Sequence, residues 1–203
     1  MATNNIFAKE ADRVKVPTMF GHADCNSFYC NAETIFLPWL RDRPIITVSN
    51  NDLCAISINT PAKSLGIEMA APLYQITDII EKNEVIIFSS NYELYGEIQS
   101  RMIMFYYQFV DRLEINSIDE CFLDFTGYEY LGYEEYGRSI VRRAAKEMRM
   151  PICLGIAPSK TLAKAANKLA KKKADRKGLY IIETESQRIE ALKELAIGDV
   201  WGI

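Results

Sequence analysis

The chain has 203 residues, 49% of them hydrophobic, which is enough to bury the core of one large domain or two small ones. A net charge of −3 and a pI near 5.4 exclude a protein that binds nucleic acid over most of its surface. The chain lacks an apolar run long enough to cross a bilayer and a basic-then-apolar secretory start, so no membrane association and a cytoplasmic location are expected.

The first half of the chain predicts short, alternating elements. Residues 1–18 are mixed polar and are expected to form a disordered extension. A strand then ends at Asp24, and a helix from 28 to about 37 stops at Pro38. A second helix begins with Thr60 as its cap and Pro61 in its first turn, and ends at Gly66. Further signals predict strands at 43–48 and 85–88 and a helix at 73–81.

The second half begins with a longer helix that Ser89 or Ser90 can cap, with an aromatic stripe that is expected to be core. Alternating residues then predict a hairpin of strands at 112–116 and 121–125. The remaining elements are predicted as helix 133–148, strand 152–156, a basic helix from about 159, strand 179–182 and helix 186–195. His22 lies in an apolar strand and is expected to be a packing residue with its polar groups satisfied.

Two adjacent acids, Asp119 and Glu120, lie near the tip of the predicted hairpin. Like charges that close repel each other, and a divalent cation is the natural compensation. Asp24, at the end of the first strand, is the candidate third ligand. Three carboxylates on two strands suit Mg²⁺, which binds a few carboxylates together with substrate phosphates. The alternative is an ordinary solvated acidic turn.

Basic residues are concentrated in one segment, from Lys160 to Lys177, although the chain as a whole is acidic. Lys160, Lys164, Lys168, Lys171 and Lys172 recur at helical spacing opposite apolar positions, which predicts a basic stripe. Such a stripe is either a solvated helix face or a surface that follows a phosphate backbone.

Several short motifs occur in a fixed order along the chain. They are Asp24-Cys25-Asn26-Ser27-Phe28-Tyr29, Glu33, Ser49-Asn50-Asn51-Asp52, Ser89-Ser90-Asn91-Tyr92-Glu93-Leu94-Tyr95, Ser117-Ile118-Asp119-Glu120, Gly155 to Lys164, and Asp199-Val200-Trp201-Gly202-Ile203. In this order they resemble the Y-family translesion DNA polymerases, and most of all the UmuC-like branch, over roughly residues 19 to 203. Each motif is weak alone, but their joint order is specific.

The resemblance implies an α+β fold: a polymerase palm, with a ferredoxin-like sheet covered by helices on one face, and a small inserted fingers domain. It places the palm at 19–28 plus 86–180, the fingers at 29–85 and the start of a thumb at 183–203. The rest of the thumb and the little finger that family members carry are absent from this sequence.

The resemblance also implies roles for individual residues. Asp24, Asp119, Glu120 and the carbonyl of Cys25 would bind two Mg²⁺ ions, for which Mn²⁺ can substitute. Tyr29 would exclude the ribonucleotide 2′-hydroxyl, with Phe28 beside it. The remaining residues would contact the nucleotide phosphates (Ser57, Thr60, Lys63 and Lys160) or DNA (Lys164, Lys168, Lys171 and Lys172).

The function implied is error-prone, template-directed DNA synthesis past lesions in the SOS response. Template-primer DNA and deoxynucleoside triphosphates would be its partners, together with a UmuD-like subunit, the RecA filament and a sliding clamp. Leu53 and Ile58 depart from the family pattern of Gly and Arg, which weakens the expected grip of the fingers. A non-catalytic remnant or regulatory fragment that binds partners or weakly binds DNA is the alternative, and a nucleotide cyclase ranks last.

Overall fold

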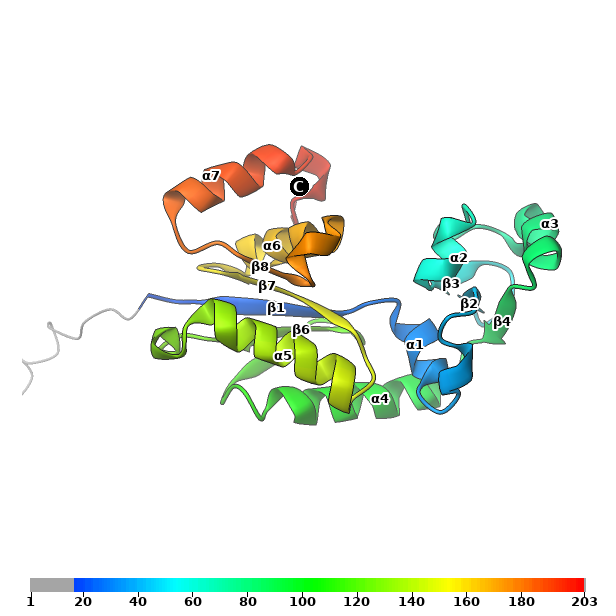
Figure 1. Cartoon of the computed structure of the whole chain (residues 1–203), viewed down its shortest axis with the longest axis horizontal. Helices are drawn as coiled ribbons and strands as arrows, with labels where there is room; N and C mark the ends of the chain where they lie inside the picture. The colour runs from blue at the N-terminus through cyan, green and yellow to red at the C-terminus, as the bar shows by residue number, and fades with distance from the viewer. Residues whose placement is uncertain (1–16, 203) are drawn as a thin grey trace, which may run out of the picture.

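The computed structural model describes residues 17–202, so most of the expected N-terminal extension lies outside the described residues. Two sheets organise the chain (Figure 1). The large sheet has the strand order β5-β6-β1-β7-β8, and the small sheet has the order β3-β2-β4. None of the helices in residues 17–202 is long and apolar enough to cross a membrane.

Strand β1 (Phe20–Cys25) lies at the centre of the large sheet. It pairs in antiparallel register with β6 (Glu120–Asp124) on one side and with β7 (Ile152–Ala157) on the other. The outer strands are β5 (Leu113–Ile115), antiparallel to β6, and β8 (Leu179–Ile181), parallel to β7. The expected α+β class is therefore confirmed, and β5 and β6 form the expected hairpin.

Helices cover both faces of the large sheet, rather than the one face expected from the sequence. In Figure 1, α4 (Tyr92–Tyr106) and α5 (Tyr133–Glu147) lie below the sheet, and α6 (Lys160–Lys172) and α7 (Glu185–Glu194) lie above it. The aromatic stripe of α4 is core, as expected: Tyr95, Phe105 and Tyr106 are almost fully buried. A separate alanine-rich core joins α6 to α7, because small side chains let these helices approach closely.

Helix α6 lies directly against β7 because residue 155 is glycine. A Cβ atom at Gly155 would lie 2.1 Å from the backbone nitrogen of Asn167 and 2.2 Å from the carbonyl oxygen of Ala163. The buried Asn167 side chain then donates hydrogen bonds to the carbonyls of His22 (2.9 Å) and Cys153 (2.7 Å). These contacts tie the basic helix to the two central strands.

The small sheet lies to one side of the large sheet, next to α1 (Phe28–Thr34). Its strands are β2 (Ile45–Val48), β3 (Ala55–Ile58) and β4 (Ile86–Ser89), with β4 parallel to β2. Helices α2 (Thr60–Ser64) and α3 (Leu73–Asn83) pack on it around Ile46, Ile58 and Ile76. Strand β3 was not predicted from the sequence. Strand β4 starts after residue 85, where the fingers were expected to end, but it pairs with β2 of this small sheet.

Two expected helix caps are wrong. Asn59 caps α2 by accepting the Ala62 amide, so Thr60 is the first helical residue instead of the cap. Asn91 caps α4 in the same way, accepting the amide of Leu94, rather than Ser89 or Ser90. Asparagine and threonine or serine are all good capping residues, so their identity alone does not fix the boundary. Short 3-10 turns at Pro38–Leu40, Glu129–Leu131, Ala174–Arg176 and Ile197–Asp199 complete the fold.

Candidate active site

Strand pairing brings together the acids that the sequence singled out. Asp24 on β1 lies directly opposite Glu120 on β6 in the antiparallel register. Asp119 precedes Glu120 at the hairpin tip, where its carbonyl accepts the Cys25 amide at 3.0 Å and its carboxylate accepts the Ser117 hydroxyl at 2.8 Å. The carboxylates therefore meet at one end of the central strand pair.

Polar neighbours fix one oxygen of Glu120. Its Oε2 accepts a hydrogen bond from Asn116 Nδ2 (2.6 Å) and pairs with Lys164 Nζ (3.0 Å), and His22 Nε2 lies 3.5 Å away. The neighbouring His22 ring and the Lys164 ammonium outweigh burial and hold the pKa of Glu120 well below its usual range. Glu120 is therefore held as a carboxylate.

Asp24 has a different electrostatic environment. Burial raises its pKa, the Lys171 ammonium 2.7 Å away opposes that rise, and the charges of Asp119 and Glu120 add to it. A carboxyl whose pKa is raised by two neighbouring carboxylates belongs to a donor set that a hard divalent cation would stabilise. In residues 17–202, however, no group of three or more His, Cys, Asp or Glu side chains is already arranged to hold a metal ion.

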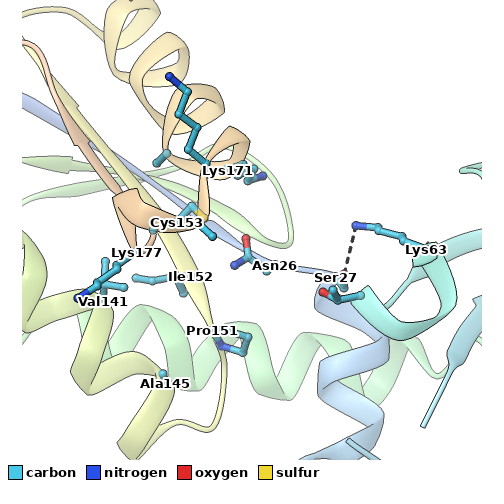
Figure 2. Close-up of a pocket in the computed structure, with 15 residues that line it drawn as sticks. Asn26, Ser27, Lys63, Val141, Ala145, Pro151, Ile152, Cys153, Lys171 and Lys177 are labelled. Atoms are coloured by element: carbon cyan, nitrogen blue, oxygen red, sulfur yellow. Dashed lines mark hydrogen bonds between the residues drawn. The ribbon is translucent and has the colours of Figure 1, made fainter. Parts of the chain in front are cut away.

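A pocket of about 490 Å³ opens between the two sheets (Figure 2), and Lys171, which pairs with Asp24, is part of its wall. Asn26 and Ser27 at the end of β1 form one wall, and Lys63 on α2 reaches across to the Ser27 hydroxyl at 3.5 Å. The other cations that line it are Lys171, Lys173 and Lys177. With Thr60 also in the wall, the pocket offers ammonium and hydroxyl groups suited to a polyphosphate.

Lys160, which the sequence assigns to the triphosphate, lies elsewhere. It pairs with Glu114 at 2.5 Å and lies near the rings of Phe20 and Phe122. Strand β1 begins at Phe20, and Asp24 lies near its other end. Lys160, at the start of α6, is therefore near the Phe20 end of the strand, and Lys171, near the end of α6, is at the Asp24 end. The structure brings Lys63, Thr60 and Lys171 around the pocket, but not Lys160.

Tyr29 lies in an aromatic cluster at the start of α1. Its ring stacks on Tyr95 at 4.3 Å and meets Tyr92 edge-on at 5.9 Å. Tyr95 is buried and donates to Glu33 Oε1 at 2.8 Å, which fixes the ring beneath Tyr29. Phe28 is buried in the core beside it. Ser57 is also buried, and its hydroxyl accepts a hydrogen bond from the Cys30 amide at 3.3 Å. Tyr29 is thus the more accessible of the two rings.

The basic stripe of α6 is paired within the chain. Lys164 contacts Glu120, Lys171 contacts Asp24, and both Lys168 (2.5 Å) and Lys172 (3.7 Å) contact Asp199. The lysines expected to contact DNA therefore already have acidic partners.

Sequence reasoning missed three features of this site. The buried His22 has no hydrogen-bond partner within the described residues for Nδ1, and its Nε2 has only the 3.5 Å approach to Glu120, so the expectation of a fully satisfied histidine is wrong. Asn116 was part of the hairpin motif, but its contact with Glu120 depends on the turn conformation. Lys173 and Lys177 belonged to the basic cluster, and their place in the pocket follows only from the turn after α6.

The large sheet with its acid-bearing hairpin, and the small sheet beside it, define the fold class of Y-family DNA polymerase palm and fingers domains. DinB from Sulfolobus solfataricus superimposes with a TM-score of 0.77 at 23% identity, over 91% of this chain and 54% of that one. A Dbh ternary complex gives a TM-score of 0.79, also at 23% identity, over 91% of this chain and 53% of that chain.

Residues 23–168 match the model of the impB/mucB/samB family, and the chain belongs to that family. Protein UmuC of Salmonella typhimurium is 38% identical over 91% of this chain, and Protein SamB of Salmonella typhimurium is 37% identical over 91%. DNA polymerase IV 1 of Bacillus subtilis is 28% identical over 90%. The chain spans 44%, 44% and 43% of these three relatives.

Proposed function

We propose that this chain supplies the palm and fingers of an error-prone DNA polymerase that extends a primer past damaged template bases. The observation that carries the proposal is the pairing of Asp24 with Glu120, together with Lys171, which contacts Asp24 and also lines the lysine-rich pocket. Family membership and the names of the relatives support the same reaction class. Template-primer DNA and a deoxynucleoside triphosphate are the proposed substrates.

The acids would hold two Mg²⁺ ions, with Mn²⁺ as a substitute. Asp24, Asp119, Glu120 and the Cys25 carbonyl would be the protein ligands. Bound there, the ions would stabilise the attacking and leaving oxygens of nucleotidyl transfer. Asn116 and Lys164 both bind Oε2 of Glu120, so they orient this carboxylate.

The pocket would take the triphosphate. Lys63 and Lys171 stand on opposite walls, and their ammonium groups can neutralise phosphate charge without losing a proton. Lys171 already contacts Asp24, so this lysine lies between the carboxylate site and the pocket. Thr60 and Ser27 would add hydroxyl donors.

Tyr29 would select the sugar. Its ring is held against Tyr95, so an added 2′-hydroxyl would meet an aromatic edge that cannot move aside without breaking that stack. Replacing Tyr29 by Ala in a polymerase completed with the thumb and little finger of a relative should admit ribonucleotides. An unchanged ratio of ribo- to deoxynucleotide insertion would place the sugar selection elsewhere.

Manganese binding by the isolated chain tests the carboxylate assignment, with free Mn²⁺ measured by electron paramagnetic resonance. Asp119→Ala and Glu120→Ala should each weaken binding at least about tenfold, because each removes a charged ligand. Asp124→Asn is the matched control, since Asp124 is on the same strand but pairs with Arg112 at 2.8 Å. Equal affinities in all variants would contradict the assignment.

A non-catalytic DNA- or partner-binding role is the second candidate, and it is favoured by Lys164 and Lys171, which pair with two of the acids that catalysis needs, Glu120 and Asp24. Primer extension separates the two functions. Incorporation that requires Asp119 and Mg²⁺ supports the polymerase. DNA binding without any incorporation, by the chain joined to a relative's thumb and little finger, supports the second role.

A further inference from the structure

Residues 197–202, here called the strap, cross the basic face of α6. Asp199 Oδ1 lies 2.5 Å from Lys168 Nζ, and its Oδ2 lies 3.7 Å from Lys172 Nζ. The Trp201 ring lies 4.8 Å from Lys164 Nζ, within the range of a cation–π contact. The strap therefore contacts three lysines of the stripe that the sequence assigns to DNA.

The strap also approaches the carboxylates. Trp201 lies 6.2 Å from Phe122, whose strand begins at Glu120. A cavity of about 460 Å³ lies between the strap and the sheet, and its walls include His22, Asp24 and Glu120 on one side and Asp199 and Trp201 on the other. A nucleic-acid backbone that follows α6 toward Asp24 would occupy the space that the strap now covers.

The contacts of the strap are weaker than those that hold α7 before it. Glu194, at the end of α7, pairs at 2.6 Å with Arg176, whose side chain is only 13% exposed. Lys168 is 47% exposed where it meets Asp199, and exposed ion pairs contribute little and are screened by salt. The strap can thus leave α6 while α7 stays packed on its alanine-rich core.

We propose that the strap is an intramolecular competitor of nucleic acid: phosphates that bind Lys168 and Lys172 displace Asp199, and the strap moves off α6. This inference goes beyond the proposed polymerase function and rests on it for the identity of the polyanion. A carboxylate and a phosphate oxygen make the same charge-assisted hydrogen bond to an ammonium group, so they compete for the same donors. Binding of the nucleic-acid backbone and release of the strap are then coupled in one equilibrium, and the Asp199 contacts lower the apparent affinity for nucleic acid.

Asp199→Asn tests the competition, because it removes the charge that occupies the two lysines while keeping the shape of the side chain. Glu190→Gln is the matched control: it removes one negative charge from an exposed position on α7. The probe is a fluorescein-labelled primer-template duplex, and its affinity is measured by anisotropy over a range of salt concentrations. Both variants should fold, since neither side chain is buried.

Asp199→Asn should bind the duplex roughly three- to tenfold more tightly than the parent at low salt, and this gain should shrink as salt rises, because salt also screens the Asp199–lysine pairs that the parent must break. Glu190→Gln should change affinity less than about twofold and leave its dependence on salt unchanged. An equal gain in both variants would reduce the effect to net charge and overturn the proposal.

Tryptophan emission reports the strap directly. The chain has two tryptophans, so Trp39→Phe leaves Trp201 as the only one. Saturating duplex should shift Trp201 emission to the red as the ring leaves Lys164 and Phe122, and Asp199→Asn should produce part of that shift without DNA. Unchanged emission in both experiments would overturn the proposal that nucleic acid displaces the strap. If no variant binds duplex, the proposed function fails. The emission spectrum of Asp199→Asn without DNA then shows by itself whether Asp199 holds the strap on α6.

Discussion

The large-sheet and small-sheet regions differ most in their ion pairs. Around the large sheet, Asp24 and Glu120 each face a lysine of α6. Within the described residues, the small-sheet region has one ion pair, Arg43–Glu84, and both of its side chains are exposed. Its surface also exposes apolar side chains: Leu53 is 59%, Met69 61% and Tyr74 78% exposed.

This difference matches two kinds of ligand chemistry. A surface of paired charges can exchange one partner for another, such as a carboxylate for a phosphate or a lysine for a cation. A surface with few ion pairs and with exposed apolar side chains can contact base edges and faces, which carry no charge. The two regions also have separate cores, so each can be perturbed alone.

The largest expected effect is in the large-sheet region. Gly155→Ala would place a Cβ atom 2.1 to 2.7 Å from backbone atoms of α6, which cannot rotate away as a side chain can. The helix must shift from β7, at a cost of roughly 4 kcal/mol of unfolding free energy. Urea unfolding followed by circular dichroism measures this loss.

Gly96→Ala is the control for that substitution. Gly96 lies inside α4, and nothing within 4 Å would meet an added Cβ. Alanine should therefore stabilise the chain by about 0.5 to 1 kcal/mol through its better helix propensity. If both alanine variants changed the unfolding free energy in the same direction, the close approach of α6 would not explain why residue 155 is glycine.

The small sheet has the next largest expected effect. Ile46 is fully buried between β3 and β4, and Ile46→Ala should cost about 3 kcal/mol of unfolding free energy. Because its core is separate, the small sheet should then unfold first, giving two transitions in urea where the parent gives one. A single shifted transition would show that the two sheets unfold as one cooperative unit.

The sequence predicted most elements to within a few residues because their signals are local. Alternating apolar residues defined the β5–β6 hairpin, and regular spacing defined α4. Strand β3 was missed because Ala55–Ile58 is short, and its identity as a strand depends on pairing with β2. That pairing is a long-range property of the fold.

The candidate site shows the same limit. Motif spacing identified Asp24, Asp119 and Glu120, and strand register places Asp24 opposite Glu120. Lys160 and Lys171 are both on the basic helix, about three turns apart, and sequence cannot say which end approaches Asp24. The antiparallel pairing of β7 with β1 decides it, because α6 then begins beside Phe20 and ends beside Asp24.

The paired charges predict opposite responses to pH. The folded-state pKa of Glu120 lies below the ordinary 4.5, so its charge stabilises the fold above that pH, and the stabilisation is lost as pH falls through the folded value. The pKa of Asp24 is raised from 3.8, so its ionised form is the less stable one in the fold, and its contribution is lost as pH rises through the folded value.

Two substitutions without metal present test this contrast. Glu120→Gln should lower the unfolding free energy at pH 7 by about 1 kcal/mol, a value that allows for solvent screening at this half-buried group, and should flatten the acid limb of the stability curve. Asp24→Asn should raise stability at pH 7 and leave less of a gain at pH 3. A gain in both variants at pH 7 would mean that burial governs the two acids, and a loss in both would mean that their ion pairs do; either result would contradict the contrast.

The smallest expected effect concerns backbone strain in the small-sheet region. Ala70 is exposed and has a φ of +63°, a left-handed conformation in which its Cβ is unfavourable. Its amide still donates to the Ala55 carbonyl at 2.8 Å, so glycine can keep the same backbone contact. Ala70→Gly relieves the strain but increases the freedom of the unfolded chain, which leaves a net gain of about 0.5 kcal/mol. Leu53, where the resemblance leads us to expect glycine, is absent from the positive-φ residues, so Leu53→Gly should instead cost about 0.5 kcal/mol. Thermal unfolding of the two glycine variants side by side should move the midpoint in opposite directions, and a gain in both would mean that the loop at Leu53 is the strained one.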